Sequence, residues 1–258
     1  MNPSFRLGKI AGIKVGLHWS VGLIAALITF TLAGSLLPNA APGFTGLAYV
    51  LVAAATAALF LASIVAHELG HSLVARRNNL GIEGITLFAL GGVAVMTAEP
   101  TRAGPAFRIA VAGPLVSLGV GALSIGAAWL AGLVGLAEVS VAALLWLGVI
   151  NIGLALFNML PAYPLDGGRV LQAALWSRSG DSLKATASAS SVGRILGSLV
   201  MFASVVQYFM TGSGIWTAAI GWFIAGSAKS EQTHARRSLV EREKAAQAAR
   251  VTALEEPV

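Results

Sequence analysis

The strongest constraint on this chain is a series of apolar segments, most of them long enough to cross a lipid bilayer. A spanning helix needs about 20 mostly apolar residues. Such segments occupy residues 17–37, 46–75, 107–136, 140–160, 192–210 and, more briefly, 214–228. Only 11% of the 258 residues are charged and 56% are hydrophobic, whereas soluble domains contain about 25% charged residues. We therefore predict an all-α polytopic membrane protein with about six transmembrane helices, and the composition excludes a soluble enzyme.

The basic residues fall on alternate connections between these segments. Clusters of Lys and Arg precede the first span and follow the second, the fourth and the sixth. Because such clusters mark cytoplasmic loops, six crossings place both termini in the cytoplasm. The Lys and Arg residues of these loops, which lie beside the lipid bilayer, account for the net charge of +6. No nucleic-acid partner is expected. We divide the chain into a membrane core, residues 1–228, and a charged cytoplasmic tail, residues 229–258.

The first span resembles a signal peptide in its position, since basic residues precede it. Its apolar run, residues 21–37, is longer than the roughly 7–15 residues of a signal-peptide core. We therefore expect this span to be retained as a transmembrane helix.

Residues 82–97 form a short segment of a different kind between the second and third spans. Residues 85–89 alternate in the manner of a strand, a glycine pair follows at 91–92, and a second apolar run occupies 93–96. This pattern predicts two short strands joined near a turn or bulge. Because an open strand cannot face lipid, the segment must pack on protein or line a wet cavity.

The most specific motif is His67-Glu68-Leu69-Gly70-His71 inside the second span. Two His residues at i and i+4 lie on one helix face, and this spacing allows both imidazoles to reach one Zn²⁺. A carboxylate beside them can accept a proton from a zinc-activated water. The chain has no Cys, so thiolate zinc ligands are excluded.

The depth of this motif favours a metal site over a cluster of mutually bonded polar side chains. Arg76 marks the cytoplasmic end of the span, so a helical rise places His71 about 7 Å and His67 about 13 Å beneath it. Ionisable groups at such depth are rare and are functional by default. We predict that His67 and His71 bind zinc, with the Glu68 carboxylate beside them.

A catalytic zinc usually has three protein ligands, and the chain has only two Asp residues, Asp166 and Asp181. Asp166 follows the fourth span on the side of His71. Pro161 and Pro164 prevent the helix from continuing there, and a glycine pair at 167–168 permits a tight turn. From spacing alone, a third zinc ligand and an ordinary surface Asp in a Pro/Gly loop are equally good interpretations of Asp166.

Together these motifs resemble the site-2 protease family of intramembrane zinc metalloproteases. His67-Glu68-x-x-His71 matches its zinc helix, and Asn158-x-x-Pro161-x-x-Pro164-Leu165-Asp166-Gly167-Gly168 matches its second motif. Gly113-Pro114-x-x-Ser117 in the third span is similar to a weaker family motif. The resemblance covers most of residues 17–228.

The resemblance implies that His67, His71 and Asp166 hold one Zn²⁺ per chain, with Glu68 as the catalytic carboxylate. It also implies that Asn158 helps to position the substrate. A helix–helix hydrogen bond is the alternative, which we favour for Asn151 but not for Asn158. The implied reaction is regulated intramembrane proteolysis, in which a single-span signalling protein in a prokaryotic cell membrane is cut near the cytoplasmic side.

The resemblance is not complete. Many prokaryotic members carry a C-terminal nucleotide-binding module and others an inserted PDZ domain, and neither is expected here. Regulation would then act through loops, the tail, or a partner in the membrane or cytoplasm. The main rival is a metal-ion transporter that uses the same His and Asp residues, but transporters often contain internal repeats, and none is apparent.

Overall fold

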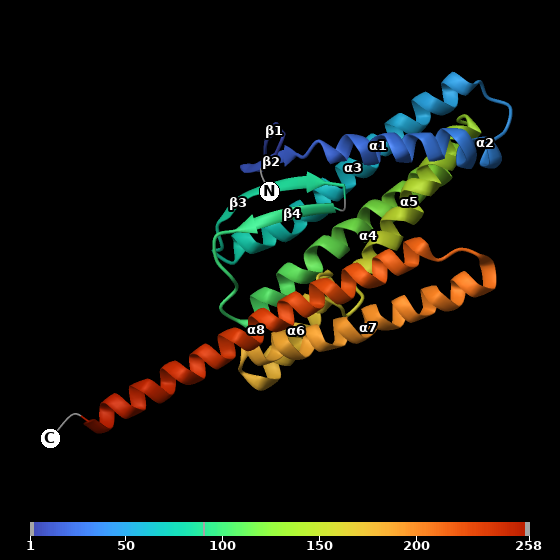
Figure 1. The fold of residues 1–258 in the computed structure, drawn as a ribbon. Helices are drawn as coiled ribbons and strands as arrows, with labels where there is room; N and C mark the ends of the chain where they lie inside the picture. The colour runs from blue at the N-terminus through green and yellow to red at the C-terminus, as the bar shows by residue number, and fades with distance from the viewer. Residues whose placement is uncertain (1–2, 90, 256–258) are drawn as a thin grey trace. The chain divides into compact units, whose positions relative to one another are not determined.

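The computed structural model describes residues 3–89 and 91–255, and most of them are helical (Figure 1). A short hairpin precedes the first helix, and a second hairpin separates α3 from α4. The elements in chain order are β1 (Phe5–Ile10), β2 (Ile13–Leu17), α1 (Ser20–Thr31), η1 (Leu32–Leu36), α2 (Leu37–Ala40), α3 (Gly46–Arg77), β3 (Ile82–Phe88), β4 (Gly91–Met96), α4 (Ala103–Leu133), α5 (Glu138–Asn158), α6 (Asp166–Ser179), α7 (Ser182–Thr211) and α8 (Ile215–Glu255).

Among the described residues, five helical segments are long and apolar enough to cross a membrane, which makes this an integral membrane protein. They are Ser20–Ala40, Gly46–Arg77, Ala103–Leu133, Glu138–Asn158 and Ser182–Thr211. Large apolar side chains project outward from them, among them Phe30, Leu123 and Phe209, each more than three-quarters exposed. In a bilayer this exposure costs nothing, because lipid replaces water as the solvent.

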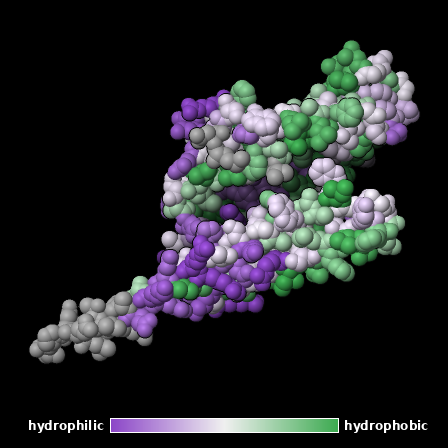
Figure 2. Space-filling view, in the orientation of Figure 1, coloured by the Kyte–Doolittle hydropathy of each residue, from purple (hydrophilic) through white to green (hydrophobic). Residues whose placement is uncertain are grey.

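The expected sixth span, residues 214–228, is not among these five segments. Its apolar part begins α8, which continues without a break to Glu255. Fifteen helical residues extend only about 22 Å, less than the roughly 30 Å hydrocarbon core. A sixth crossing therefore stays a prediction. The predicted boundary between core and tail at residue 228 falls inside this helix. Figure 2 shows hydrophilic side chains on the part of the molecule next to the grey end of the helix.

The described chain forms two compact units. The first comprises Met1–Pro100 and Val111–Asn158, and the second comprises Thr101–Ala110 and Met159–Val258. The first unit contains a four-stranded sheet in the order β1-β2-β3-β4. The β1–β2 and β3–β4 pairs are antiparallel, and β2 runs parallel to β3.

The sheet packs on α3 through its apolar face. Side chains of β2 and β3 form a buried cluster with helix residues from α1 and α3, whose members are Ile13, Val15, Val21, Val65, Ile85 and Leu87. The strands expected at 82–97 are present as β3 and β4, but the β1–β2 hairpin was missed, and the first span begins at Ser20 rather than at residue 17. The strands of the β1–β2 hairpin are short and contain glycine at positions 8 and 16. Glycine weakens the alternation of apolar and polar residues that indicates a strand.

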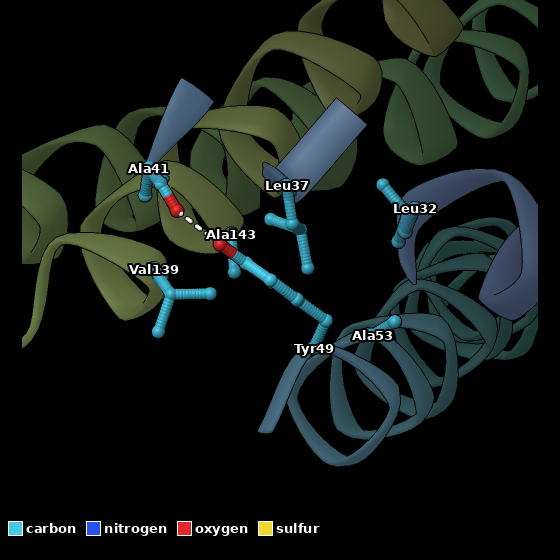
Figure 3. Packing of buried hydrophobic residues seen from close by; sticks show 7 residues of the cluster. All are labelled: Leu32, Leu37, Ala41, Tyr49, Ala53, Val139 and Ala143. Atoms are coloured by element: carbon cyan, nitrogen blue, oxygen red, sulfur yellow. Dashed lines mark hydrogen bonds between the residues drawn. The ribbon is translucent and has the colours of Figure 1, made fainter. Parts of the chain in front are cut away.

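A second buried cluster joins the end of the first span to α3 and α5. Figure 3 shows Leu32, Leu37, Ala41, Tyr49, Ala53, Val139 and Ala143 packed together. The Tyr49 hydroxyl donates to the carbonyl oxygen of Ala41 at 2.7 Å, which satisfies a buried polar group at the helix end. The first span contains a π-helical turn, η1, just before Pro38.

In the second unit, α7 and α8 form a helical hairpin, and α6 packs on α7. The connection contains Gly212 and Gly214, both with positive φ, a conformation that glycine adopts without strain. The two helices approach closely at Gly197, where a Cβ would lie 2.9 Å from Cα of Ala225. Small residues at the seam therefore set the spacing of this hairpin.

Asp181 begins α7 and ties it to the C-terminal part of α8. Its Oδ1 accepts from the backbone N–H groups of Leu183 and Lys184, and its Oδ2 accepts from Arg242 at 3.1 Å. Slight burial acts to raise the pKa of this carboxyl, but the Lys184 N–H, the Arg242 guanidinium and the Leu183 N–H together hold the pKa below its usual value. The stabilisation is thus present above the unfolded pKa of about 3.9 and is lost as the pH falls.

We expect Asp181→Ala to lower the free energy of unfolding by about 1 kcal/mol at pH 7, because the helix loses its N-terminal cap. Asp181→Asn, which keeps a capping oxygen, should lose less. Unfolding of the purified protein in detergent, followed by circular dichroism at pH 7 and at pH 3, measures both effects. The difference between Asp181→Ala and wild type should narrow at the lower pH, and equal stabilities at pH 7 would contradict the assigned cap.

Candidate metal centre

The two His residues of α3 meet at their Nε2 atoms. His67 is buried and His71 half-buried, and their Nε2 atoms lie 3.2 Å apart. Two nitrogens that bind one tetrahedral zinc at 2.0–2.1 Å lie about 3.3 Å from each other. The rings are therefore already oriented as a pair of ligands to one metal ion, and the donor set fits zinc.

A residue of α4 fixes the orientation of His67. The Nδ1 atom of His67 lies 2.9 Å from the hydroxyl oxygen of Ser117, a fully buried side chain. When Nδ1–H donates to this oxygen, Nε2 carries the lone pair that a metal requires. The sequence contains Gly113-Pro114-x-x-Ser117 as a weak motif, but the contact between Ser117 and His67 was not apparent from it.

Glycine at position 113 leaves the space that the imidazoles occupy. A Cβ there would lie 2.6 Å from Nε2 of His67 and would also overlap His71. On the other side, a Cβ at Gly70 would lie 3.0 Å from the carbonyl oxygen of Ala112. The glycines at 70 and 113 thus allow α3 and α4 to approach closely at the level of the His pair.

Glu68 lies between the zinc helix and the sheet. It is half-buried, and a Cβ at Gly92 of β4 would overlap its side chain, with the carboxylate oxygen Oε1 3.1 Å from that position. The first glycine pair of the sequence, at 91–92, therefore has a steric function, because a larger residue at 92 would displace the predicted catalytic carboxylate. This contact was not apparent from the sequence.

The first unit thus brings His67, Glu68 and His71 together with Gly113 and Ser117. Asn158, the last residue of α5, is also in this unit, where its Nδ2 donates to the carbonyl oxygen of Leu154 at 3.0 Å. Asn151, seven residues earlier, is fully buried and donates to the Leu147 carbonyl oxygen of its own helix.

Asp166, the predicted third ligand, is the first residue of α6 in the second unit and is half-buried. The turn before it is fixed by packing, because Ala162 and Leu165 are buried with Ile224 of α8. A Cβ at Gly167 would overlap the carbonyl oxygens of Met159 and Leu160, so glycine allows the chain to cross the start of α6. The helix ends before Pro161 as predicted, but Gly167 and Gly168 lie inside α6 rather than in a tight turn, and the ligand role of Asp166 stays a proposal.

Side chains of three elements hold this turn. The Tyr163 hydroxyl donates to Oε1 of Gln172 at 2.9 Å, and Nε2 of Gln172 donates to the hydroxyl of Thr186 at 2.7 Å. Tyr163 is itself buried against Ala189 and Ala228. The direction in which the chain enters α6 is therefore set by contacts from α6, α7 and α8.

The sequence model of the family described as Peptidase family M50 matches residues 55–136 and 125–202. Together these ranges cover more than half of the chain. The chain belongs to peptidase family M50. This assignment confirms the resemblance to site-2 proteases that the motifs indicated. The matched residues include the His67–His71 helix, the α4 motif and Asp166.

Individual proteins similar to this chain are named zinc metalloproteases. Over 240 residues the chain is 42% identical to a protein of Mycobacterium tuberculosis named zinc metalloprotease Rip3, an alignment covering 90% of this chain and 60% of Rip3. It is 36% identical over 202 residues to zinc metalloprotease MJ0392 of Methanocaldococcus jannaschii, which covers 78% of this chain and 54% of that protein. The chain therefore spans little more than half the length of these relatives.

A solved structure has the same fold. The site-2 protease from Methanocaldococcus jannaschii superposes with a TM-score of 0.56 at 29% sequence identity, covering 88% of this chain and 94% of that chain. The fold of this chain is thus similar to that of a solved site-2 protease.

We expect Gly113→Ala to reduce bound zinc to well below one ion per chain, because the added methyl group occupies the position of the imidazole nitrogens. Gly119→Ala on the same helix is the matched control, since a Cβ there meets no described heavy atom within 4 Å. Elemental analysis of purified protein measures the zinc, and circular dichroism verifies the helical content. Full zinc occupancy in a folded Gly113→Ala protein would show that the imidazoles are not the ligands.

Proposed function

We propose that this chain is a zinc-dependent intramembrane endopeptidase, which cleaves transmembrane segments of membrane-bound proteins near the cytoplasmic side. The observation that carries the proposal is the 3.2 Å separation of the two His Nε2 atoms with Glu68 adjacent to them inside an apolar helix. Family membership and the names of the relatives support the same chemistry.

We assign Asp166 as the third zinc ligand, beside His67 and His71. The chain has only one other Asp, and Asp181 is engaged as the cap of α7 and the partner of Arg242. The start of α6 is held rigidly by the contacts of Tyr163 and Leu165, which suits a ligand whose direction must be fixed. When bound, zinc supplies a Lewis acid for the scissile carbonyl and lowers the pKa of water toward 7.

Glu68 accepts the proton of the attacking water and returns it to the leaving amine. Its proximity to Gly92 of β4 limits the positions open to the carboxylate, and its neighbour in the sequence is His67. Asn158 stands at the end of α5, where a side-chain amide can bond the backbone of an unwound substrate.

The substrate must be extended before cleavage, because the carbonyl groups of a helix are engaged internally. The strand β4 is an edge of the sheet, and its side chains at Val93 and Val95 are nearly half exposed. An extended peptide that adds to this edge would lie next to Glu68. Substrates with helix-weakening residues should therefore be preferred, and a single-span signalling protein is the substrate class that the family resemblance favours.

We expect Glu68→Gln to abolish cleavage while zinc and helical content stay at wild-type levels, because the amide cannot accept the water proton. The assay is cleavage of a transmembrane substrate by the reconstituted protein, with and without a chelator, and with product masses determined by mass spectrometry. Cleavage by Glu68→Gln at the wild-type rate would refute the role of Glu68. Zinc flux across the same vesicles without any cleavage would instead identify a transporter.

We expect Asp166→Asn to lower the zinc content below one ion per chain, because a neutral amide is a much weaker zinc ligand than a carboxylate. Asp181→Asn is the matched control, which removes the only other Asp and should leave the zinc content unchanged. Elemental analysis of the purified proteins provides the comparison. The ligand assignment would be wrong if Asp166→Asn binds one zinc ion per chain and retains it against a chelator as well as the wild-type protein does.

A further inference from the structure

We propose that the β1–β2 hairpin, together with Trp19, binds the anionic phospholipid surface of the protein's own membrane. The proposal concerns a surface that the peptidase chemistry does not use. It depends on the charge and apolar side chains that the hairpin register places on opposite faces.

The register gathers three cations on one face of the hairpin. Lys9 pairs directly with Lys14, and Arg6 pairs with Gly16. Directly paired residues share a face, and so do alternate residues of one strand. Arg6, Lys9 and Lys14 therefore project from the same face, and all three are exposed. A directly opposed pair of like charges destabilises a hairpin, so this face is suited to an anionic partner.

The chain itself offers this face little compensating charge. No Asp or Glu precedes Glu68 in the sequence. The four strands of the sheet together contain three cations and a single carboxylate, Glu83 of β3. The hairpin is thus a basic element, and its counter-charges must come mainly from outside it.

The other face of the hairpin is apolar and extends beyond the helix that the sheet covers. Ile13 and Val15 of β2 are buried on α3. Their face also carries Phe5 and Ile10 of β1, which are 63% and 44% exposed. Leu7, at the bulge between Arg6 and Gly8, is 59% exposed. Exposed apolar side chains beside cations are typical of segments that lie in the membrane interface.

The position of the hairpin places it at that interface. Only two residues separate β2 from α1, the beginning of the first membrane-spanning segment. One of them is Trp19, which is 63% exposed and belongs to a residue type enriched at the headgroup level. The turn is also tied to the second span, because Arg76 Nη1 donates to the carbonyl oxygen of Ala11 at 2.6 Å. A lipid surface therefore lies within reach, which favours lipid over a soluble protein as the partner.

The hairpin and Glu68 lie at opposite edges of the same sheet. β1 and β4 are the two edges of one sheet, and β4 contacts Glu68 through Gly92. Lipid binding at the hairpin does not depend on the proposed peptidase function.

The test uses the full chain in phosphatidylcholine vesicles that contain spin-labelled phosphatidylglycerol or spin-labelled phosphatidylcholine. Quenching at Trp19 is obtained as the difference between wild type and Trp19→Phe, since the chain has six Trp residues. We expect stronger quenching by phosphatidylglycerol, and this preference should disappear in 1 M salt, where the Debye length is about 3 Å.

A triple variant, Arg6→Gln with Lys9→Gln and Lys14→Gln, should reduce the preference for phosphatidylglycerol by roughly ten- to a hundredfold. The matched control removes three exposed cations of α8, through Lys229→Gln, Arg236→Gln and Arg237→Gln, and should keep the preference. Equal quenching by both lipids in wild type would overturn the proposal, as would absence of quenching, which would indicate a protein partner. The wild-type salt dependence decides the question even if the triple variant does not fold, and none of these measurements requires proteolysis.

Discussion

Two imidazoles and a carboxylate inside an apolar helix cannot be solvated by lipid, and this constraint shapes the first unit of the protein. The polar groups must find partners within the protein. The structure provides them by bringing α4 close enough for Ser117 to contact His67 and by covering Glu68 with a strand. Glycines at 70, 92 and 113 make each of these approaches possible. The geometry of the candidate site therefore depends on these glycines as well as on the His and Glu side chains.

The sheet has two separable features. Its edge at β4 lies beside the predicted catalytic carboxylate, whereas its opposite edge is a basic hairpin with exposed apolar residues. A bilayer surface and an active site thus contact the same small sheet in the proposed arrangement. The sheet is joined to α3 by the buried cluster of β2 and β3 on one face and by the contact of Arg76 with the hairpin turn.

Much of the candidate site could be predicted from the sequence. A His pair at i and i+4 fixes its own geometry, since one helix carries both residues and their separation follows from the helical repeat. The end of α5 before Pro161 was also predictable, because Pro acts on the local backbone, whereas the glycine pair at 167–168 belongs to α6. By contrast, Ser117 contacts His67 and Gly92 contacts Glu68, and each pair is more than 20 positions apart in the sequence. No local pattern encodes which distant side chain these residues will meet.

Apolar length and helical spacing are local properties. They were therefore sufficient to predict an integral membrane protein, four of its spans to within a few residues, and two His residues on one face of α3. The tertiary structure alone decided that an N-terminal hairpin completes the sheet, that the last apolar segment begins a 41-residue helix, and that Gly113 leaves room for the two imidazoles. Strand pairing and helix packing are contacts between distant segments, and the chain acquires them only when those segments bury their surfaces against each other.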